Sequence, residues 1–225
     1  MAVDSRDQIK RYFEQSQQLF GNEIYRTNEP AAEVYQSTVD SLDEFRLQIH
    51  ECKRCSLAAT RTNFVFGAGD PNADLVCVGE APGADEDAQG VPFVGRAGKL
   101  LDKILAAIDI SRERNVFICN VLKCRPPQNR DPLAEEVLQC EPHLIRQLEL
   151  IKPKLIVALG RVAAKTLLKI EGNVALKDLR NKIHDYHGTP LIATYHPAAL
   201  LRSSRFKQPT WEDFKWIKKI LNSEA

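Results

Sequence analysis

Short apolar runs alternate with amphipathic segments through most of this chain. Four runs rich in Val, Ile and Leu end in glycine or a polar turn, as buried parallel strands do. They span residues 74–79, 115–120, 154–160 and 190–195. Apolar residues recur at helical spacing in residues 41–50, 97–108, 133–151, 161–170 and 211–221. This order predicts an α/β fold of three layers (α/β/α), in which helices flank a four-stranded parallel sheet.

The first 38 residues differ from the rest, being rich in Gln, Glu, Asn and Arg. Residues 7–20 have a helical pattern with a thin apolar face, so we expect an N-terminal extension, residues 1–38, that is partly helical or disordered. A domain spanning 39–225 follows it. Residues 15–20 are similar to peptides that bind replication sliding clamps. Matches this short are common by chance, so we favour the solvated extension and keep the clamp as an alternative.

Composition sets limits on the class of protein. The 225 residues are 44% hydrophobic and 27% charged, which is typical of a globular protein with one sizeable core. No apolar stretch approaches the roughly 20 residues that cross a bilayer, and the N-terminus has no signal-peptide core. We therefore expect a cytoplasmic protein, a monomer by default, with no membrane partner. The net charge of +1 does not indicate nucleic acid, so any DNA contact must come from local Arg and Lys clusters.

Four of the six cysteines have the spacing of metal ligands. Cys52 and Cys55 form a C-x2-C pair, and Cys124 and Cys140 follow far downstream. In a reducing compartment this pattern indicates a metal site rather than a disulfide. Cys52, Cys55, Cys140 and His143 are an alternative set that is typical of zinc. The remaining two lie in apolar runs and are interpreted as buried strand residues: Cys77 and Cys119.

Polar residues follow three of the predicted strands at their carboxyl ends. The segments are 79–83 with the acidic loop 85–87 and 92–95, then 120–130, then 196–202. Ligands bind beyond the carboxyl ends of parallel strands, so a carboxylate, two carboxamides, a histidine and an aromatic ring converge on one rim. Each residue alone also fits a turn, a helix cap or a core position. Their coincidence at one edge is what favours a functional site.

Five segments together resemble the family 4 uracil-DNA glycosylases, the iron–sulfur branch of that superfamily. They are residues 52–55, 79–83, 92–98, 120–130 and 196–202. The resemblance covers about residues 41–221 and implies an enzyme that flips uracil out of DNA and hydrolyses the N-glycosidic bond, leaving an abasic site. It also implies a structural 4Fe–4S cluster on Cys52, Cys55, Cys124 and Cys140, with zinc as the alternative metal.

The resemblance also assigns roles at the site. Glu80 stabilises the oxocarbenium-like sugar and orients water, Asn120 reads the uracil edge, and His196 donates to uracil O2. Phe93 stacks on the base, and the backbone N–H near Ala81 helps to stabilise the leaving group. The best-known branch of the superfamily has an aspartate where this chain has Ala81, so other carboxylates are candidates for the water-activating group.

Further residues are candidates for substrate and DNA contact. Asp87 and Glu86 are the alternative carboxylates, and Asn129 supports the uracil pocket. Leu200 is the expected apolar wedge that enters the minor groove. Phosphate contacts are expected from Arg125, Arg130, Arg202, Arg205 and Lys207.

Two other functions compete with turnover. One is a uracil-DNA binder that traps its product covalently. That branch has an Arg- and His-containing insertion after the Pro-Phe-Val-Gly segment, whereas here Gly95 leads directly into Arg96. The other is a replication-associated iron–sulfur or zinc module without turnover, for which the extension 1–38 is the only support.

Overall fold

The computed structural model describes residues 39–223. The predicted extension 1–38, with its helix and its clamp-like peptide, lies outside the described residues. No helix among the described residues is long and apolar enough to cross a membrane.

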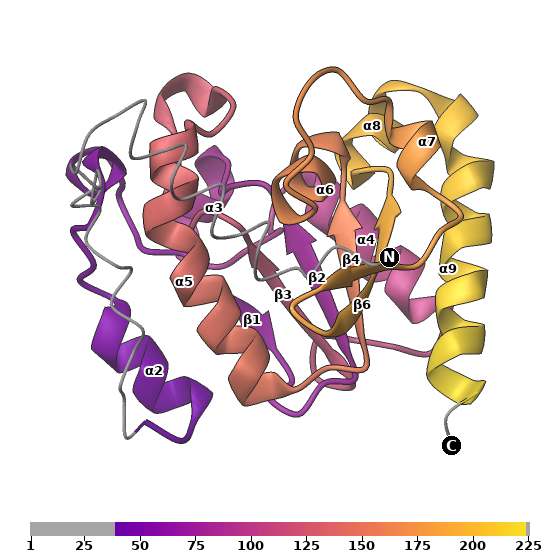
Figure 1. The fold of residues 1–225 in the computed structure, drawn as a ribbon, viewed down its shortest axis with the longest axis horizontal. Coiled ribbons are helices and arrows are strands. Elements are labelled where there is room, and N and C mark those ends of the chain that lie inside the picture. Colours follow the sequence, from indigo (N-terminus) through magenta and orange to yellow (C-terminus); the bar gives the residue numbers. More distant parts are fainter. Residues whose placement is uncertain (1–38, 224–225) are drawn as a thin grey trace, which may run out of the picture. The chain divides into compact units, whose positions relative to one another are not determined.

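A six-stranded sheet forms the centre of the domain, in the order β1-β3-β2-β4-β6-β5 (Figure 1). Its four inner strands are parallel: β2 (Leu75–Gly79), β3 (Val116–Asn120), β4 (Leu155–Leu159) and β6 (Thr189–Thr194). Every residue of β2, β3 and β4 is buried, as their continuous apolar runs require. The four predicted strands are therefore confirmed, with ends that differ by at most one residue.

The prediction of a purely parallel four-stranded sheet was wrong at both edges. β1 (Ala68–Gly69) pairs antiparallel with β3, and β5 (His184–Tyr186) pairs antiparallel with β6. Neither segment is an apolar run, so the sequence pattern carried no signal for them. The close approach of β1 requires glycine, since a Cβ on Gly69 would lie 2.2 Å from the Val116 carbonyl oxygen.

The longer helices agree with the predicted amphipathic segments. They are α2 (Leu42–Ile49), α4 (Arg96–Ala106), α5 (Ala134–Ile151), α6 (Arg161–Leu167) and α9 (Lys207–Ser223). Three shorter helices were not predicted: α3 (Ala84–Gln89), α7 (Leu176–Leu179) and α8 (Pro197–Arg202). Single 3₁₀ turns are η1 (Ser56–Ala59), η2 (Pro127–Asn129) and η3 (Ser204–Phe206). Segments of one or two turns are too short to show a helical period.

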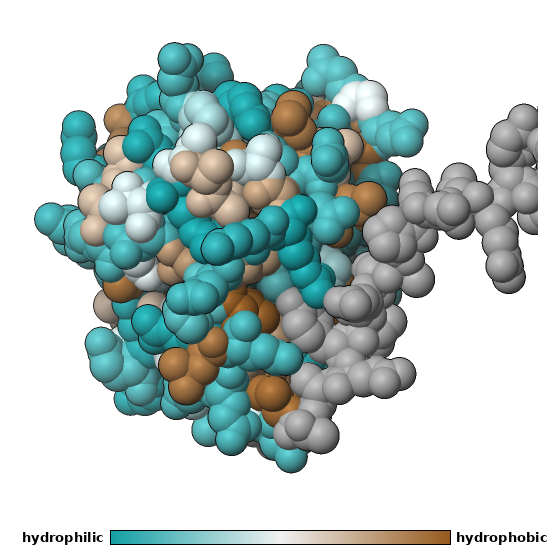
Figure 2. Space-filling model, turned by 90° about the vertical axis from the view of Figure 1, so that its left-hand side faces the viewer, coloured by the Kyte–Doolittle hydropathy of each residue, from teal (hydrophilic) through white to brown (hydrophobic). Residues whose placement is uncertain are grey.

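Helices cover both faces of the sheet, which confirms the predicted layers. Figure 1 shows the sheet between α5 on one side and α4 with α9 on the other. Leu101 and Leu105 of α4 share one core with Phe214 and Ile217 of α9 and with the strand residue Cys77. Burial of each such side chain stabilises the fold by about 1.5–3 kcal/mol. The face that carries α2 is mainly hydrophilic, with small apolar groups (Figure 2).

An ion pair anchors the carboxyl end of β6 to the last helix. Nε and Nη2 of Arg180 each donate to a carboxylate oxygen of Asp213 at 2.8 Å. Thr194, the last residue of β6, donates its hydroxyl to the same carboxylate at 2.5 Å. Asp213 is 1% exposed and Arg180 is 9% exposed. The network fixes the strand end two residues before His196.

Replacing Asp213 with Ala tests this anchor. The change leaves a buried guanidinium without its counter-charge, so the free energy of unfolding should fall by about 3–5 kcal/mol. Lys218→Ala is the control, because Lys218 pairs with Asp109 at the surface and its loss should barely change the urea midpoint. Equal midpoints for the two variants would contradict the assignment.

Candidate active site and cysteine cluster

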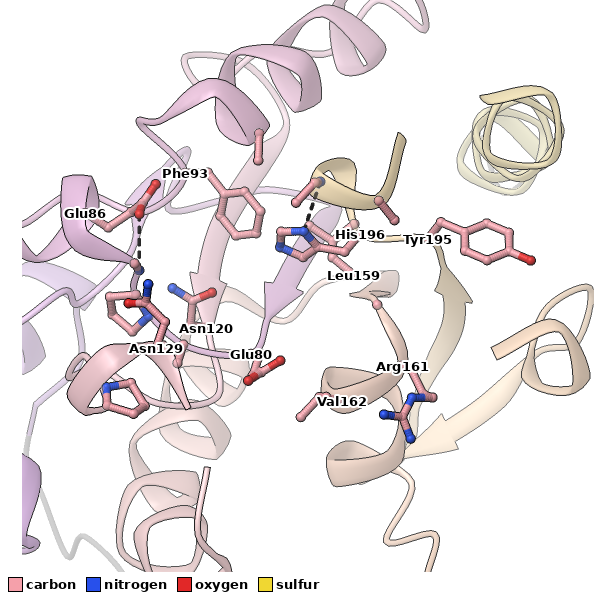
Figure 3. A pocket seen from close by; sticks show the side chains of 18 of the residues that line it. Glu80, Glu86, Phe93, Asn120, Asn129, Leu159, Arg161, Val162, Tyr195 and His196 are labelled. Atoms are coloured by element: carbon pink, nitrogen blue, oxygen red, sulfur yellow. Dashed lines mark hydrogen bonds between the residues drawn. The ribbon is translucent and has the colours of Figure 1, made fainter. Parts of the chain in front are cut away.

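A cavity of about 610 Å³ opens at the carboxyl edge of the parallel strands (Figure 3). Residues that follow β2, β3, β4 and β6 line it. In Figure 3 the labelled side chains of Glu80, Phe93, Asn120 and His196 face a common space. This is the edge of the sheet at which the sequence analysis predicted that the polar residues converge.

The register of β2 and β3 brings Glu80 and Asn120 together. Gly79 is paired with Asn120, and past the strand ends the Leu122 N–H still donates to the Glu80 carbonyl at 3.0 Å. Gly79 has no Cβ, and that permits the packing around it. A Cβ there would lie 2.3 Å from Oδ1 of Asn120 and 2.7 Å from Cζ of Phe93. The glycine therefore lets the amide and the ring lie against the strand end.

Phe93 forms the aromatic wall of the cavity. Its ring centroid lies 5.4 Å from that of His196, with an interplanar angle of 32°. Its φ of 55° is in the left-handed region that a bulky side chain rarely adopts. Arg112 holds this backbone by donating to the Phe93 carbonyl at 2.7 Å, and a Cβ on Gly98 would lie only 1.7 Å from the same oxygen. The surrounding chain thus enforces the position of the ring.

His196 is a neutral hydrogen-bond donor. Its Nδ1 accepts the backbone N–H of Ala198 at 3.1 Å as the cap of α8, so the ring proton is on Nε2. Burial lowers the pKa of His196 to about 4, and the charge of Arg202 acts in the same direction. The imidazole is therefore uncharged at neutral pH and offers Nε2–H to a ligand.

The pKa of Glu80 is shifted in the opposite direction, also by burial. Burial, and after it the charge of Asp131, raise the pKa of Glu80 to about 7 against the opposing charge of Arg161. Its side chain lines the cavity beside Asn120. Near neutral pH this carboxylate is only partly ionised, as suits a group that orients or activates water.

Glu86 joins two loops at the rim of the cavity. Its Oε1 accepts the N–H groups of Val94 and Gly95 at 3.0 and 3.1 Å, and its Oε2 accepts that of Gly83 at 3.1 Å. Three backbone donors fix this carboxylate, so it holds the segment that carries Phe93 against the segment after β2.

Three segments supply the cysteine quartet, which comprises Cys52, Cys55, Cys124 and Cys140. The first two follow α2, the third follows β3, and the last is in α5. Cys124 and Cys140 are buried in one apolar group, against which Cys55 also packs; its other members include Leu57, Leu122 and Ala81. Burial raises the pKa of Cys140 to about 12 and raises those of Cys55 and Cys124. A metal that bound here would have to displace the thiol protons.

Hydrogen-bond donors surround the sulfur atoms. The contacts are Arg61 Nη1 to Cys124 Sγ at 3.2 Å, Lys123 N–H to Cys140 Sγ at 3.3 Å, and His143 Nε2 beside Cys52 Sγ at 3.2 Å. Such donors favour thiolates and are typical of the surroundings of a metal centre. Among residues 39–223, no three His, Cys, Asp or Glu side chains lie close enough to hold a single ion. A 4Fe–4S cluster needs wider spacing, because each cysteine binds a different iron.

Comparison with known proteins gives the family. Residues 66–215 match the uracil DNA glycosylase superfamily. The type-4 uracil-DNA glycosylase of Archaeoglobus fulgidus is 45% identical over 185 residues, which cover 80% of this chain and 92% of that protein. The chain belongs to the type-4 branch of the uracil-DNA glycosylase superfamily. The type-4 enzyme of Sulfurisphaera tokodaii is 43% identical (81% of this chain, 86% of that protein), and that of Thermotoga maritima is 41% identical (79% and 93%).

Most residues predicted from the resemblance to this superfamily line one cavity. They are Glu80, Ala81, Phe93, Asn120, Asn129, Arg130, His196 and Arg202. Asp87 does not. It is 5% exposed, and its carboxylate accepts the N–H of Thr62 at 2.9 Å and that of Asn63 at 3.3 Å. The turn of α3 aims Asp87 inward and presents Glu86 to the cavity, so Asp87 lies apart from the other residues predicted to bind the substrate.

The arginines predicted to contact DNA have different surroundings. Arg130 pairs with the buried Glu136 at 2.5 Å, so its charge is already balanced. Arg125 donates to Asn129 Oδ1 at 2.8 Å, and the guanidinium of Arg205 lies 4.6 Å from the Phe206 ring centroid. Arg125 and Arg205 do not line the cavity. The exposed Arg202 is at its edge.

Leu200 does not have the exposure of a wedge. It is 4% exposed and packs inward from α8, whereas the next residue, Leu201, is 44% exposed. The turn of α8 decides which of the two leucines faces solvent. The sequence motif does not contain that information, and the prediction from it fell on the buried leucine.

Some cavity residues were not singled out from the sequence, and two of them carry polar groups. Arg161 and Tyr195 both line the cavity, although the Tyr195 ring points away from the central group in Figure 3. Arg161 directly follows the third predicted strand, so that strand end carried a signal. The segment 160–161 has no acid, amide or histidine, and only the fold shows that it faces Glu80.

Proposed function

We propose that this chain removes uracil from DNA by hydrolysing the N-glycosidic bond, leaving an abasic site. The observation that carries this is the convergence of a neutral histidine, a half-buried carboxylate, a carboxamide and an aromatic ring in one cavity. The relatives named type-4 uracil-DNA glycosylase support it. A base inside a duplex is inaccessible, so the target nucleotide flips into the cavity.

Asn120 and Phe93 recognise the base. The Asn120 carboxamide donates to uracil O4 and accepts from N3–H, a pattern that cytosine cannot match because its donor and acceptor are exchanged. Asn120 is 2% exposed, so a wrong base would leave a buried amide unpaired at a cost of about 1–3 kcal/mol. Phe93 supplies the stacking face.

His196 and the backbone near Ala81 stabilise the leaving group. Negative charge develops on uracil O2 as the bond breaks, and Nε2–H of a neutral His196 donates to that oxygen. The neutral form suffices, because a uracil anion leaves without being fully protonated. The Ala81 N–H, beside Glu80 on the cavity wall, is a second donor.

Glu80 stabilises the oxocarbenium-like sugar and orients the attacking water. The other two candidate carboxylates are occupied: backbone donors hold both Glu86 and the buried Asp87. No backbone donor of residues 39–223 holds the carboxylate of Glu80 in this way, and burial raises its pKa to about 7, so it retains basicity for this role.

The cysteine quartet holds a structural 4Fe–4S cluster. Its supports are the gathering of Cys55, Cys124 and Cys140 at one apolar group, the donors at the sulfur atoms and the type-4 relatives. Through these four ligands the cluster would tie the segment after α2 to the loop after β3 and to α5. Glycosidic cleavage needs no open metal position, so catalysis does not pass through the metal. Zinc is the alternative occupant.

Arg202 and Arg205 contact DNA phosphates beside the cavity, and Arg125 does so from the loop after β3. Leu201, rather than Leu200, is the apolar wedge that fills the gap left by the flipped base. Its exposure and its place one residue before Arg202 support this.

Uracil excision and its pH dependence test Glu80. An oligonucleotide containing uracil should be cut at the uracil after incubation and alkali. Because Glu80 acts when deprotonated, the single-turnover rate should rise about tenfold per pH unit below its pKa of about 7 and level off above it. Glu80→Gln should lower the plateau by about 100-fold and remove this inflection.

Glu86→Gln is the matched control, and it should keep the inflection at a reduced rate. Binding of uracil-DNA by wild-type chain without excision at any pH would overturn the function and leave a binding module.

Two neighbouring leucine variants test the wedge. Leu201→Ala should lower excision from duplex DNA by about tenfold, with little effect on single strands, where no base stack must be refilled. Leu200→Ala should instead lower the free energy of unfolding by about 2–5 kcal/mol. An unchanged ratio of duplex to single-strand rates in Leu201→Ala would argue against Leu201.

Iron and acid-labile sulfide assays on anaerobically purified protein test the cofactor. We expect about four of each per chain and a brown colour. Cys140→Ser should lose both, whereas Cys77→Ala, a change within β2, should keep them. A colourless wild-type protein that contains zinc would refute the 4Fe–4S cluster.

A further inference from the structure

Lys123 is completely buried, with 0% of its surface exposed, between Asn120 and the ligand position Cys124. Its ammonium donates to the Asn120 carbonyl at 2.8 Å and to Oε1 of Gln147 at 2.5 Å. Its own N–H donates to Cys140 Sγ at 3.3 Å. One residue thus contacts the end of β3 that carries the uracil reader, the helix α5 and a sulfur of the quartet.

The charge of Lys123 lacks a carboxylate partner. Both acceptors of its ammonium are neutral amide oxygens, and no Asp or Glu in residues 39–223 forms a salt bridge with it. A buried ammonium is costly unless opposite charge lies close by. The Lys123 backbone N–H contacts Cys140 Sγ at 3.3 Å and Cys124 is the next residue, so the quartet lies beside this side chain.

We propose that Lys123 is a positioning residue whose ammonium is held in the core by the negative charge of the metal-bound quartet. Four thiolates carry more negative charge than a 4Fe–4S core carries positive charge, so the assembled centre is an anion beside Lys123. This inference rests on the proposed cofactor and function. It goes beyond them because it connects the cluster, through Lys123, to the backbone of Asn120, which reads uracil.

The route is a chain of hydrogen bonds. The Gln147 side-chain oxygen accepts a hydrogen bond from the Lys123 ammonium, and its amide nitrogen donates to the Phe66 carbonyl at 2.9 Å. The second bond fixes the Gln147 side chain in place. Gln147 and Cys140 are both on α5, and they hold the side chain and the backbone of Lys123 respectively. The ammonium then fixes the Asn120 carbonyl. A change in the charge of the quartet acts on the backbone of the residue that reads uracil.

Three variants separate the charge from the hydrogen bonds. Lys123→Met keeps the aliphatic volume and removes the charge, and Lys123→Gln removes the charge but keeps a donor. Gln147→Leu keeps the charge and removes one acceptor. We expect the reduction midpoint of the cluster, measured by voltammetry, to shift to more negative potential in both Lys123 variants, because a nearby positive charge favours the reduced state. Gln147→Leu should leave the midpoint near that of wild type.

Excision is the second readout. Lys123→Met and Gln147→Leu should each lower the single-turnover rate by about 10- to 100-fold, because both loosen the support of Asn120. Loss of iron from both Lys123 variants, with iron retained in Gln147→Leu, would also support the proposal, since the cluster then requires the charge. An unchanged midpoint in iron-loaded Lys123→Met or Lys123→Gln would overturn it. Failure of the wild type to excise uracil would refute the proposed function instead, without altering these midpoints.

Discussion

The parallel pairing of β2 with β3 is the constraint on which the site depends. Its register sets Gly79 opposite Asn120, and the backbone ladder continues past the strand ends to join Leu122 to Glu80. Because the missing Cβ of Gly79 leaves room for the Asn120 amide and the Phe93 ring, one glycine makes this wall of the cavity possible. If one strand slipped by one residue in this pairing, its side chains would move to the other face of the sheet, and Asn120 would no longer lie opposite Gly79.

Burial then decides the chemistry of the titratable groups. It lowers the pKa of His196 to about 4 and raises that of Glu80 to about 7, because a dry cavity disfavours the charged form of each group. The result is a neutral donor across from a carboxylate that retains basicity near pH 7. These two states match what departure of a uracil anion and attack by water require.

The cysteine quartet and the cavity are joined through one apolar group of side chains. Cys124 follows Asn120 by four residues, and Ala81 of the cavity wall packs on the apolar group that holds Cys124 and Cys140. With the proposed metal in place, the loop after β3 is fixed on the side away from the base. The buried Lys123 lies at the junction, with contacts to both sides.

The sequence by itself determined the four inner strands, the longer helices, the spacing of the quartet and the residues around Glu80, Asn120 and His196. Apolar runs and helical periods can be read from neighbouring residues alone, and the site motifs directly follow the predicted strands. Only the tertiary structure decided the edge strands, the inward turn of Asp87, the exposure of Leu201 rather than Leu200, and the position of Arg161. These depend on contacts between segments distant in the chain. The pKa values of Glu80 and His196 follow the same rule, because desolvation depends on everything packed around a group.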